Sequence, residues 1–325
     1  MIPYTQCLRV AQALATLVLL LSLSFAAKVV SAGTVVRFDT VEGVFDVQLY
    51  DNNMPVTVAN FLSYADAGRY DGTVVHRNSD TQGRDFVIQG GGFSLNDPDP
   101  PDPNAIISFD YVVDPSNPDP PINDEPGGGV AGPSNLRGTI AMAKSGPNTV
   151  TSQWFINQGD NSFLDSPTRG DGGFSSFGTV LGDGMIVVDA IGDLPLPGDF
   201  GFGIGSPFND LPLRNFSGTA INHVRVANTV TVNSISQLAL VPGDFNLDGL
   251  VDDEDLAILN ANFGTESGAL VDDGDADMDG DVDGDDFLAW QGNVGTVPGL
   301  SATSIPEPST LLLVASGLIA IFCRR

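Results

Sequence analysis

Two short apolar segments in the middle of the chain read Arg137-Gly138-Thr139-Ile140-Ala141-Met142-Ala143 and Ser152-Gln153-Trp154-Phe155-Ile156-Asn157. They belong to a series of short strand-like segments, separated by glycine- and proline-rich turns, that continues as far as Val232. Such a series is typical of an all-β domain. The composition agrees, because 38 Gly and 22 Pro among 325 residues favour a turn-rich β architecture over a helical bundle.

The segments around this series complete the predicted domain, residues 33–236. Residues 34–38 and 44–50 alternate apolar and polar side chains around Glu42-Gly43, which indicates a β-hairpin. Residues 55–67 are expected to form a helix that starts at Pro55 and stops at Gly68. A second helix is expected at 185–191 and a final strand at 224–232. Many short strands with two helices predict a mainly β fold, a closed antiparallel β-barrel with two capping helices.

Several sequence motifs in this domain are more specific than its strand pattern. Residues 70–77 read Tyr-Asp-Gly-Thr-Val-Val-His-Arg, and 86–93 read Phe-Val-Ile-Gln-Gly-Gly-Gly-Phe. The two apolar segments quoted first come next, followed by Asp160-Asn161-Ser162-Phe163-Leu164-Asp165 and Phe177-Gly178-Thr179-Val180. In this order, from about Val35 to Ile191, the motifs resemble the cyclophilin family of peptidyl-prolyl cis-trans isomerases, particularly its secreted bacterial members.

The resemblance implies a set of site residues. The implied catalytic residues are Arg77, Phe86, Gln89 and Phe155. The implied substrate-binding residues are Val87, Ala143, Gln153, Phe163, Leu164 and Phe174. Three of these depart from common family choices: many members have Met at the Val87 position, eukaryotic members often have Trp at Phe163, and Phe174 follows an insertion at 166–173 where His or Tyr is frequent. Phenylalanine at 163 suggests weak cyclosporin binding, and none of the departures removes the catalytic group.

The physics of proline isomerisation is consistent with this site. Amide resonance resists rotation about an X–Pro bond, with a barrier of about 20 kcal/mol. In the twisted state the prolyl nitrogen is basic, so a guanidinium that donates a hydrogen bond to it favours that state over either planar isomer. Arg77 stays charged and offers a fixed fork of donors. Phe86, Phe155 and Leu164 would form the slot for the proline ring, while Gln89 would orient Arg77 or the substrate carbonyl. No cofactor is expected for isomerisation.

Taken one at a time, these residues have simpler interpretations. Phe155 and Phe163 alone would be core residues, and Arg77 alone would be a surface ion pair; it is their occurrence together with the flanking motifs that favours a site. His76 is expected to face away from the groove and to be structural. The alternative function is a non-catalytic module that binds proline-containing segments and is tethered to an envelope scaffold.

Charge and cysteine content exclude other classes of function. The chain has 41 Asp and Glu against 13 Lys and Arg, a net charge of −28, so it would repel nucleic acid. Both cysteines, Cys7 and Cys323, lie in terminal hydrophobic segments, which leaves no thiol in the body of the chain. With two histidines, a His-based metal centre or a Ser-His-Asp triad is hard to assemble.

An acidic segment between residues 241 and 296 predicts a second module. Asp244–Asp286 holds 16 acidic residues, and no Lys or Arg occurs between Val226 and Cys323. The spacing matches two twelve-residue calcium loops 31 residues apart, each with Gly at position 6 and an apolar, helix-like run after it. The predicted Ca²⁺ ligands are Asp244, Asn246, Asp248, Leu250, Asp252 and Asp255 in the first loop, and Asp275, Asp277, Asp279, Asp281, Asp283 and Asp286 in the second.

Both loops have Asp rather than Glu at position 12, and this paired arrangement resembles the dockerin type I modules, a variant of the EF-hand. The resemblance implies a small α-helical module with two Ca²⁺ sites and suggests a cohesin-like or envelope scaffold protein as a partner. The alternative is an acidic linker.

Both ends of the chain contain apolar segments. Residues 1–32 are expected to be a secretory signal peptide cut after Ala32 or earlier near Ala26, with an uncleaved anchor as the alternative. Beyond a linker at 297–304, residues 305–325 contain Pro306-Glu307-Pro308, 13 apolar residues and two terminal arginines. This pattern resembles the PEP-CTERM sorting signal and implies processing by an exosortase; an ordinary short membrane anchor is the alternative. Thirteen helical residues cover about 20 Å, short of a bilayer core.

The predicted protein is therefore exported, to the periplasm or to the cell surface and beyond, with membrane contact only through its terminal segments. Two inserts enlarge the β domain: 96–126, expected to be an extended surface loop, and 192–222. Either could shape access to the groove or contact a partner.

Overall fold

A computed structural model of the chain describes residues 33–80, 85–98, 102, 104–113, 119–125 and 132–296. The predicted signal peptide (1–32), linker (297–304) and sorting segment (305–325) lie outside the described residues. Within the part that is described, no helix is long and apolar enough to cross a membrane.

The predicted hairpin opens the domain. β1 (Val35–Thr40) pairs antiparallel with β2 (Gly43–Leu49), and the turn between them includes Glu42. Gly43 has a φ of 143°, which few residues other than glycine adopt. Alternate residues of β1, among them Val36 and Phe38, are fully buried, as the period of two in a strand requires.

Eight strands form one sheet in the order β10-β1-β2-β9-β7-β8-β4-β3, in which every ladder is antiparallel. The remaining strands of this sheet are β3 (Arg77–Asp80), β4 (Asp85–Gly90), β7 (Thr139–Met142), β8 (Trp154–Asn157), β9 (Ser176–Val180) and β10 (Val232–Gln237). The end strands, β3 and β10, form no ladder with each other. The prediction of a fully closed barrel was therefore wrong in this detail: the sheet is a curled half-barrel.

A short stretch of backbone spans the opening between the end strands. Val74, just before β3, forms an isolated antiparallel bridge with Thr231, just before β10. The amide of Val75 donates to the carbonyl of Val230 at 2.9 Å, and the amide of Gly72 donates to the carbonyl of Val232 at 2.8 Å. These bonds satisfy backbone groups that an open sheet edge would leave unpaired.

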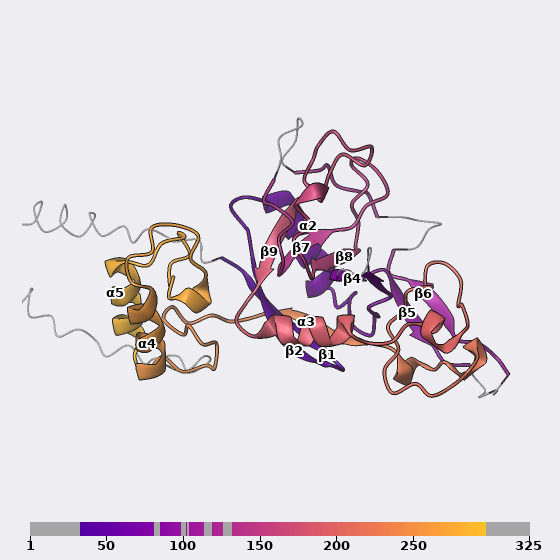
Figure 1. Ribbon diagram of the computed structural model, residues 1–325. Helices are drawn as coiled ribbons and strands as arrows, with labels where there is room; N and C mark the ends of the chain where they lie inside the picture. Colours follow the sequence, from indigo (N-terminus) through magenta and orange to yellow (C-terminus); the bar gives the residue numbers. More distant parts are fainter. Residues whose placement is uncertain are drawn as a thin grey trace, which may run out of the picture. The chain divides into compact units, whose positions relative to one another are not determined.

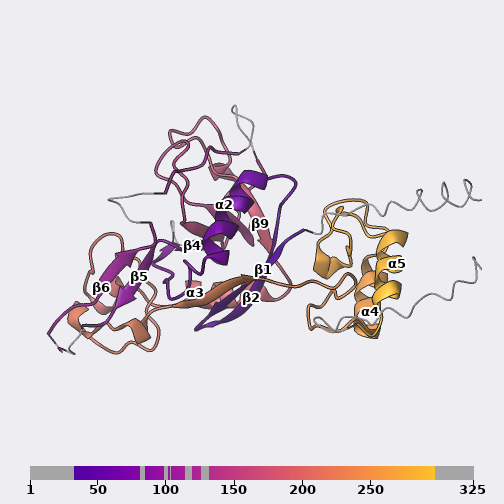
Figure 2. The ribbon, with the colours of Figure 1, turned by 180° about the vertical axis from the view of Figure 1, so that it is seen from behind.

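Two helices pack against this sheet, as predicted (Figure 1). α2 (Pro55–Asp66) begins with Pro in its first turn, where the missing N–H costs nothing, and contacts β10. α3 (Gly184–Gly192) contacts β2. α2 is the nearer helix in Figure 2 and α3 in Figure 1, so the two cover different sides of the sheet.

The inserts are more ordered than predicted. β5 (Phe93–Asn96) pairs with β6 (Ser108–Tyr111) in a separate two-stranded sheet, so the 96–126 insert contains a strand and is not only an extended loop. The 192–222 insert contains short 3₁₀ turns and packs on the β5–β6 sheet through a second apolar cluster that includes Phe93, Phe208 and Leu211. The 3₁₀ turns among the described residues are η1 (Ser162–Leu164), η2 (Pro197–Phe200), η3 (Ile221–His223), η4 (Val226–Asn228) and η5 (Val271–Asp273).

The predicted final strand at 224–232 was also wrong. That segment contains the 3₁₀ turn η4, and the last strand, β10, starts only at Val232. Val224 is fully buried, but in the apolar cluster of the insert and not in the sheet. Its apolar character therefore reflects packing without a strand ladder.

The acidic module contains two helices that follow the acidic loops. α4 (Asp253–Asn262) follows the first loop and α5 (Gly284–Asn293) follows the second, and both start with an Asp N-cap, Asp252 and Asp283. The helices contact each other. Their apolar cluster includes Phe245, Val251, Leu259, Val282 and Trp290.

Candidate active site

Arg77 is the first residue of β3 and pairs with Gln89 of β4. Its Nη1 donates to Oε1 of Gln89 at 3.4 Å, and its Nη2 donates to Oγ of Ser79 at 3.1 Å. The third guanidinium nitrogen, Nε, lies 3.6 Å from Oδ2 of Asp210 in an ion pair. The Arg77 side chain is 40% exposed, so it is partnered and still open to solvent.

Gln89 is in turn held by Gln153. The amide nitrogen Nε2 of Gln89 donates to Oε1 of Gln153 at 2.8 Å. The chain of polar contacts therefore runs from Gln153 through Gln89 to Arg77, and it fixes the side-chain orientation that Gln89 needs to accept from the guanidinium.

The alternation of strands β4 and β8 divides their side chains between two clusters. Ile88, Trp154 and Ile156 are buried in the main core. Their neighbours Val87 and Phe155 lie in a separate small cluster on the other face of the sheet. Because successive strand residues face opposite sides, the same two strands supply both the core and the floor of a groove.

This groove is a cavity of about 320 Å³ that begins at Arg77. Eight of the ten site residues expected from the sequence line it: Arg77, Phe86, Val87, Gln89, Ala143, Phe155, Leu164 and Phe174. An arginine with free N–H donors thus borders an apolar slot wide enough for a small ring, which suits a planar, uncharged peptide segment with an apolar side chain.

The other two expected residues lie beside the cavity and do not line it. Gln153 contacts Gln89 through the 2.8 Å hydrogen bond. Phe163 is 56% exposed and stacks on Phe86 with ring centres 5.8 Å apart. It therefore supports the rim of the groove from outside.

Phe174 closes one side of the cavity. Its amide donates to the carbonyl of Leu164 at 2.8 Å, and its ring meets that of Phe155 edge to face, with centres 5.7 Å apart. This is a favoured geometry for aromatic pairs.

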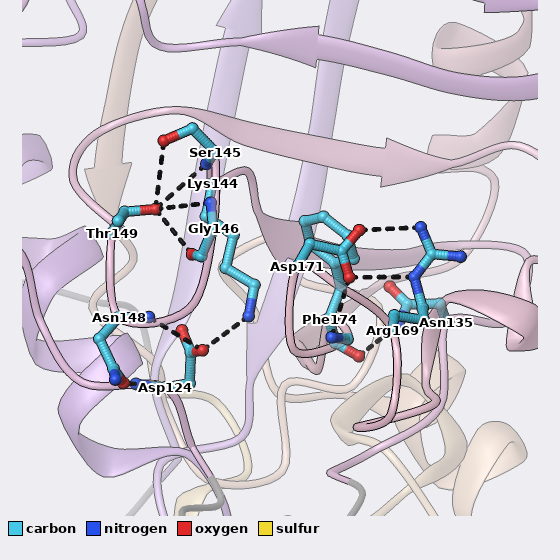
Figure 3. A network of polar contacts seen from close by, with 11 residues as sticks. Asp124, Asn135, Lys144, Ser145, Gly146, Asn148, Thr149, Arg169, Asp171 and Phe174 are labelled. Carbon is cyan, nitrogen blue, oxygen red and sulfur yellow. Dashed lines mark hydrogen bonds and ion pairs between the residues drawn. The ribbon is translucent and has the colours of Figure 1, made fainter.

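Three charged residues that sequence reasoning missed also line the cavity, Lys144, Arg169 and Asp171 (Figure 3). Lys144 Nζ pairs with Asp124 Oδ2 at 2.7 Å and lies 5.3 Å from the centre of the Phe174 ring. Arg169 binds Asp171 through two hydrogen bonds, of 3.0 and 2.8 Å. The hydrogen bonds from Arg169 lower the pKa of Asp171. The sequence signals were the cation directly after Ala143 and the Arg169-Gly-Asp171 sequence within the 166–173 insertion.

His76 faces away from the groove, as predicted. It is 2% exposed, its ring meets that of Phe93 edge to face, and its Nδ1 has no hydrogen-bond partner. Burial lowers the pKa of His76 to about 4, so the ring is neutral at pH 7. Nearby, a Cβ at Gly91 would lie 2.8 Å from the carbonyl oxygen of Ser152, so a glycine at this position permits the close approach of the two backbone segments.

Comparison with known proteins agrees with this geometry. The family described as cyclophilin type peptidyl-prolyl cis-trans isomerase/CLD matches residues 35–202. The peptidyl-prolyl cis-trans isomerase of Acinetobacter baylyi is 39% identical over 165 residues, which are 50% of this chain and 74% of that protein. Isomerase A of Dickeya dadantii is 38% identical over 181 residues, 55% of this chain and 82% of that protein.

The chain belongs to the cyclophilin family. It is a cyclophilin-type peptidyl-prolyl cis-trans isomerase. Isomerase B of Escherichia coli is 35% identical over 48% of this chain and 82% of that protein. A solved structure, the cyclophilin type isomerase of Cryptosporidium parvum, is 20% identical and covers 64% of this chain and 99% of its own, with a TM-score of 0.40. The PEP-CTERM protein-sorting motif matches residues 304–325.

Outside the cyclophilin domain, the two acidic loops have matching backbones. Leu247 and Met278, at position 4 of each loop, have φ of 58° and 56°, and Gly249 and Gly280, at position 6, have 90° and 94°. The position-12 carboxylates also match. Asp255 accepts from the amides of Phe245 at 2.8 Å and Asp252 at 2.9 Å. Asp286 accepts from the amides of Ala276 and Asp283, both at 2.7 Å.

Two backbone hydrogen bonds link the end of each helix to the loop of the other half of the module. The amide of Gly264, after α4, donates to the carbonyl of Val282 in the second loop at 2.8 Å, and the amide of Gly295, after α5, donates to that of Val251 in the first loop at 2.9 Å. The two donors, Gly264 and Gly295, are 31 residues apart, and so are the two acceptors, Val251 and Val282. The module is therefore a structural repeat in which each half braces the other.

The second loop brings its carboxylates closest together. Oxygens of Asp275, Asp277 and Asp286 lie within 4.8 Å of one another, and so do those of Asp281, Asp283 and Asp286. Oδ2 of Asp275 accepts from Gly280 at 2.8 Å, whereas its buried Oδ1 has no hydrogen-bond partner. Burial raises the pKa of Asp275 to about 7, and it also raises those of Asp244 and Asp277. Converging carboxylates of this kind suit a hard divalent cation. The dockerin resemblance and the scaffold partner stay predictions.

Proposed function

We propose that Arg77 is the catalytic residue of this isomerase and that its guanidinium donates a hydrogen bond to the prolyl nitrogen as the X–Pro bond twists. The observation that carries this proposal is the cavity, which places an arginine with remaining N–H donors at the border of an apolar slot. The interaction strengthens only when the nitrogen becomes basic, so it lowers the barrier and does not merely bind substrate.

The other groove residues have complementary proposed roles. Phe155 and Leu164, both 5% exposed, form with Phe86 the apolar slot for the proline ring. Gln89 orients Arg77, and Gln153 acts one step further away by holding Gln89. Val87, Ala143 and Phe174 shape the walls that contact the residues flanking the proline.

We further propose that the substrates are proline-containing segments of exported proteins. The support is the PEP-CTERM motif at 304–325, a sorting signal that implies export and processing by an exosortase-type enzyme.

The acidic module adds a proposed calcium function. We infer that each loop binds one Ca²⁺ through the ligands expected from the sequence. The support is the matching backbone of the loops, together with the buried Asp275 oxygen that has no protein partner. A cohesin-like or envelope scaffold protein is the partner proposed for the loaded module.

The isomerase proposal is tested with a proline-peptide isomerisation assay on the mature protein, the Arg77→Ala variant and the Arg77→Lys variant. Loss of a preorganised donor is expected to lower kcat/KM about 100-fold or more. Lysine keeps the charge and lacks the planar fork, so it should restore little of the rate. Equal rates for the wild type and Arg77→Ala would remove the proposed role of Arg77, and a groove that binds such peptides without accelerating isomerisation would select the binding-module alternative.

A further inference from the structure

The 192–222 insert places a carboxylate beside the groove arginine. Oδ2 of Asp210 lies 3.6 Å from Nε of Arg77, and the two side chains are 45% and 40% exposed. The other partners of the guanidinium, Gln89 and Ser79, are neutral. Asp210 is therefore the charged partner of Arg77 among the described residues.

The three partners approach three different nitrogens of the guanidinium. Asp210 faces Nε, Gln89 accepts from Nη1, and Ser79 accepts from Nη2. Each terminal nitrogen carries two hydrogens, so Nη1 and Nη2 each keep one N–H for a substrate. The Asp210 carboxylate thus lies at the Nε side of the guanidinium and leaves the remaining N–H groups of Nη1 and Nη2 available to a substrate.

The insert is fixed to the strand that carries Arg77. The neighbouring residue, Asn78, donates its backbone amide to the carbonyl of Asp210 at 2.7 Å. Its side-chain Nδ2 donates to the carbonyl of Gly192, at the start of the same insert, at 2.5 Å. One β3 residue therefore binds both the beginning of the insert and the segment with the carboxylate.

The segment around Asp210 is also held by packing. Phe208 is 4% exposed and Leu211 is fully buried in the apolar cluster beneath the insert. A carboxylate between two buried anchors has little freedom to move, which is the property a group needs in order to hold another side chain in place.

We propose that Asp210 is a positioning residue for the isomerase reaction, which holds the guanidinium of Arg77 in the orientation that donates to the prolyl nitrogen. This inference rests on the proposed role of Arg77. An arginine side chain has several rotatable bonds, and catalysis by a preorganised donor depends on its being aimed before the transition state forms.

The test compares the full-length wild type with Asp210→Asn, Asp210→Glu and a control, Asp193→Asn, which removes the same charge from an exposed position of the same insert. Exchange NMR on an X–Pro peptide gives kcat and KM separately. Asp210→Asn is expected to lower kcat about five-fold with KM unchanged, a size typical of one partly exposed ion pair. Asp210→Glu should restore part of the rate, and Asp193→Asn should match the wild type.

Two further readouts separate positioning from a structural role. Because exposed ion pairs contribute little to stability, the Tm of Asp210→Asn should match that of the wild type. The Arg77 Nε–H resonance should shift in Asp210→Asn and stay in place in Asp193→Asn. In an Arg77→Ala background, Asp210→Asn should have no additional effect on the rate.

Several outcomes would overturn the inference. If Asp210→Asn is as active as Asp193→Asn, the carboxylate has no role in the reaction. If Asp210→Asn is more active than the wild type, the carboxylate restrains Arg77 and does not position it for catalysis. An unmoved Arg77 resonance would contradict the contact itself, even if a variant were unstable. If Arg77→Ala is inactive while Asp210→Asn is fully active, only this inference fails; if Arg77→Ala is fully active, the proposed function fails first.

Discussion

The groove of the cyclophilin domain and the second acidic loop treat charge in opposite ways. In the groove, Arg77, Lys144 and Arg169 each lie beside a carboxylate. In the loop, carboxylates converge and a buried oxygen of Asp275 has no hydrogen-bond partner. A paired site is already arranged for a neutral peptide, whereas converging carboxylates repel one another until a cation joins them. The difference indicates that the groove is preformed, and under the proposed calcium function it predicts that the module needs the ion to fold.

The largest expected effect is therefore on the module. Ca²⁺ at about 1,000 times its dissociation constant would stabilise each site by about 4 kcal/mol, so excess chelator should melt the module while isomerase activity stays within about two-fold. Calorimetry on the full chain should find two sites, one of them lost in Asp275→Ala.

The matched control for the module is Glu266→Gln, which removes an exposed acidic charge from outside both loops and should keep both sites. An identical titration for Asp275→Ala and Glu266→Gln would refute the ligand assignment.

The next effect in size concerns a buried group beside the groove. Burial lowers the pKa of His76 from 6.5 to about 4, so the unfolded chain takes up its proton at a higher pH than the folded chain. The contribution of neutral His76 is complete above pH 6.5 and falls as the pH drops from 6.5 towards 4, by about 3 kcal/mol in total.

Urea unfolding at pH 7 and pH 4.5 measures this loss, and His76→Asn provides a side chain that does not titrate in this range. The wild type should lose more stability than the variant between the two pH values. Parallel losses would show that other groups account for the acid sensitivity.

The smallest expected effect tests where the groove ends, at Phe163. Phe163 is exposed and lies outside the cavity lining, so Phe163→Ala should change kcat/KM by less than about three-fold, as exposed positions usually tolerate truncation. Phe155→Ala, which empties the slot, is the contrasting variant in the same peptide assay. A Phe163→Ala effect as large as that of Phe155→Ala would extend the site over the η1 turn.

Local sequence signals were enough for much of the fold. The Glu42-Gly43 turn and Pro55 mark a hairpin and a helix start through backbone preferences that act over a few residues, and both are present. The 224–232 segment misled because tertiary packing buries its valines without a strand ladder. Val224 packs in the insert cluster and Val230 in the main core, and neither lies in a strand. β6 was missed because Asp and Pro surround it, and its pairing with β5 is a contact between distant segments.

The groove residues also fall into those that the sequence could place and those that it could not. Residues within the quoted motifs, such as Arg77 and Phe155, could be placed because the motifs fix their position in the sheet. The pairing of Arg77 with Asp210, across 133 positions of sequence, could not be foreseen. Nothing in the composition of the 192–222 insert specifies where its chain returns to β3.

The reciprocal bonds of the acidic module have a consequence for its cooperativity. The amides of Gly264 and Gly295, which follow α4 and α5, each donate to a carbonyl of the opposite loop. Neither half therefore has a complete set of backbone hydrogen-bond partners by itself. A chain shortened after α4 would lose the brace on its first loop as well as the second loop. We therefore expect the two halves to gain and lose order together, and we expect a Ca²⁺ ion bound in one half to stabilise the other.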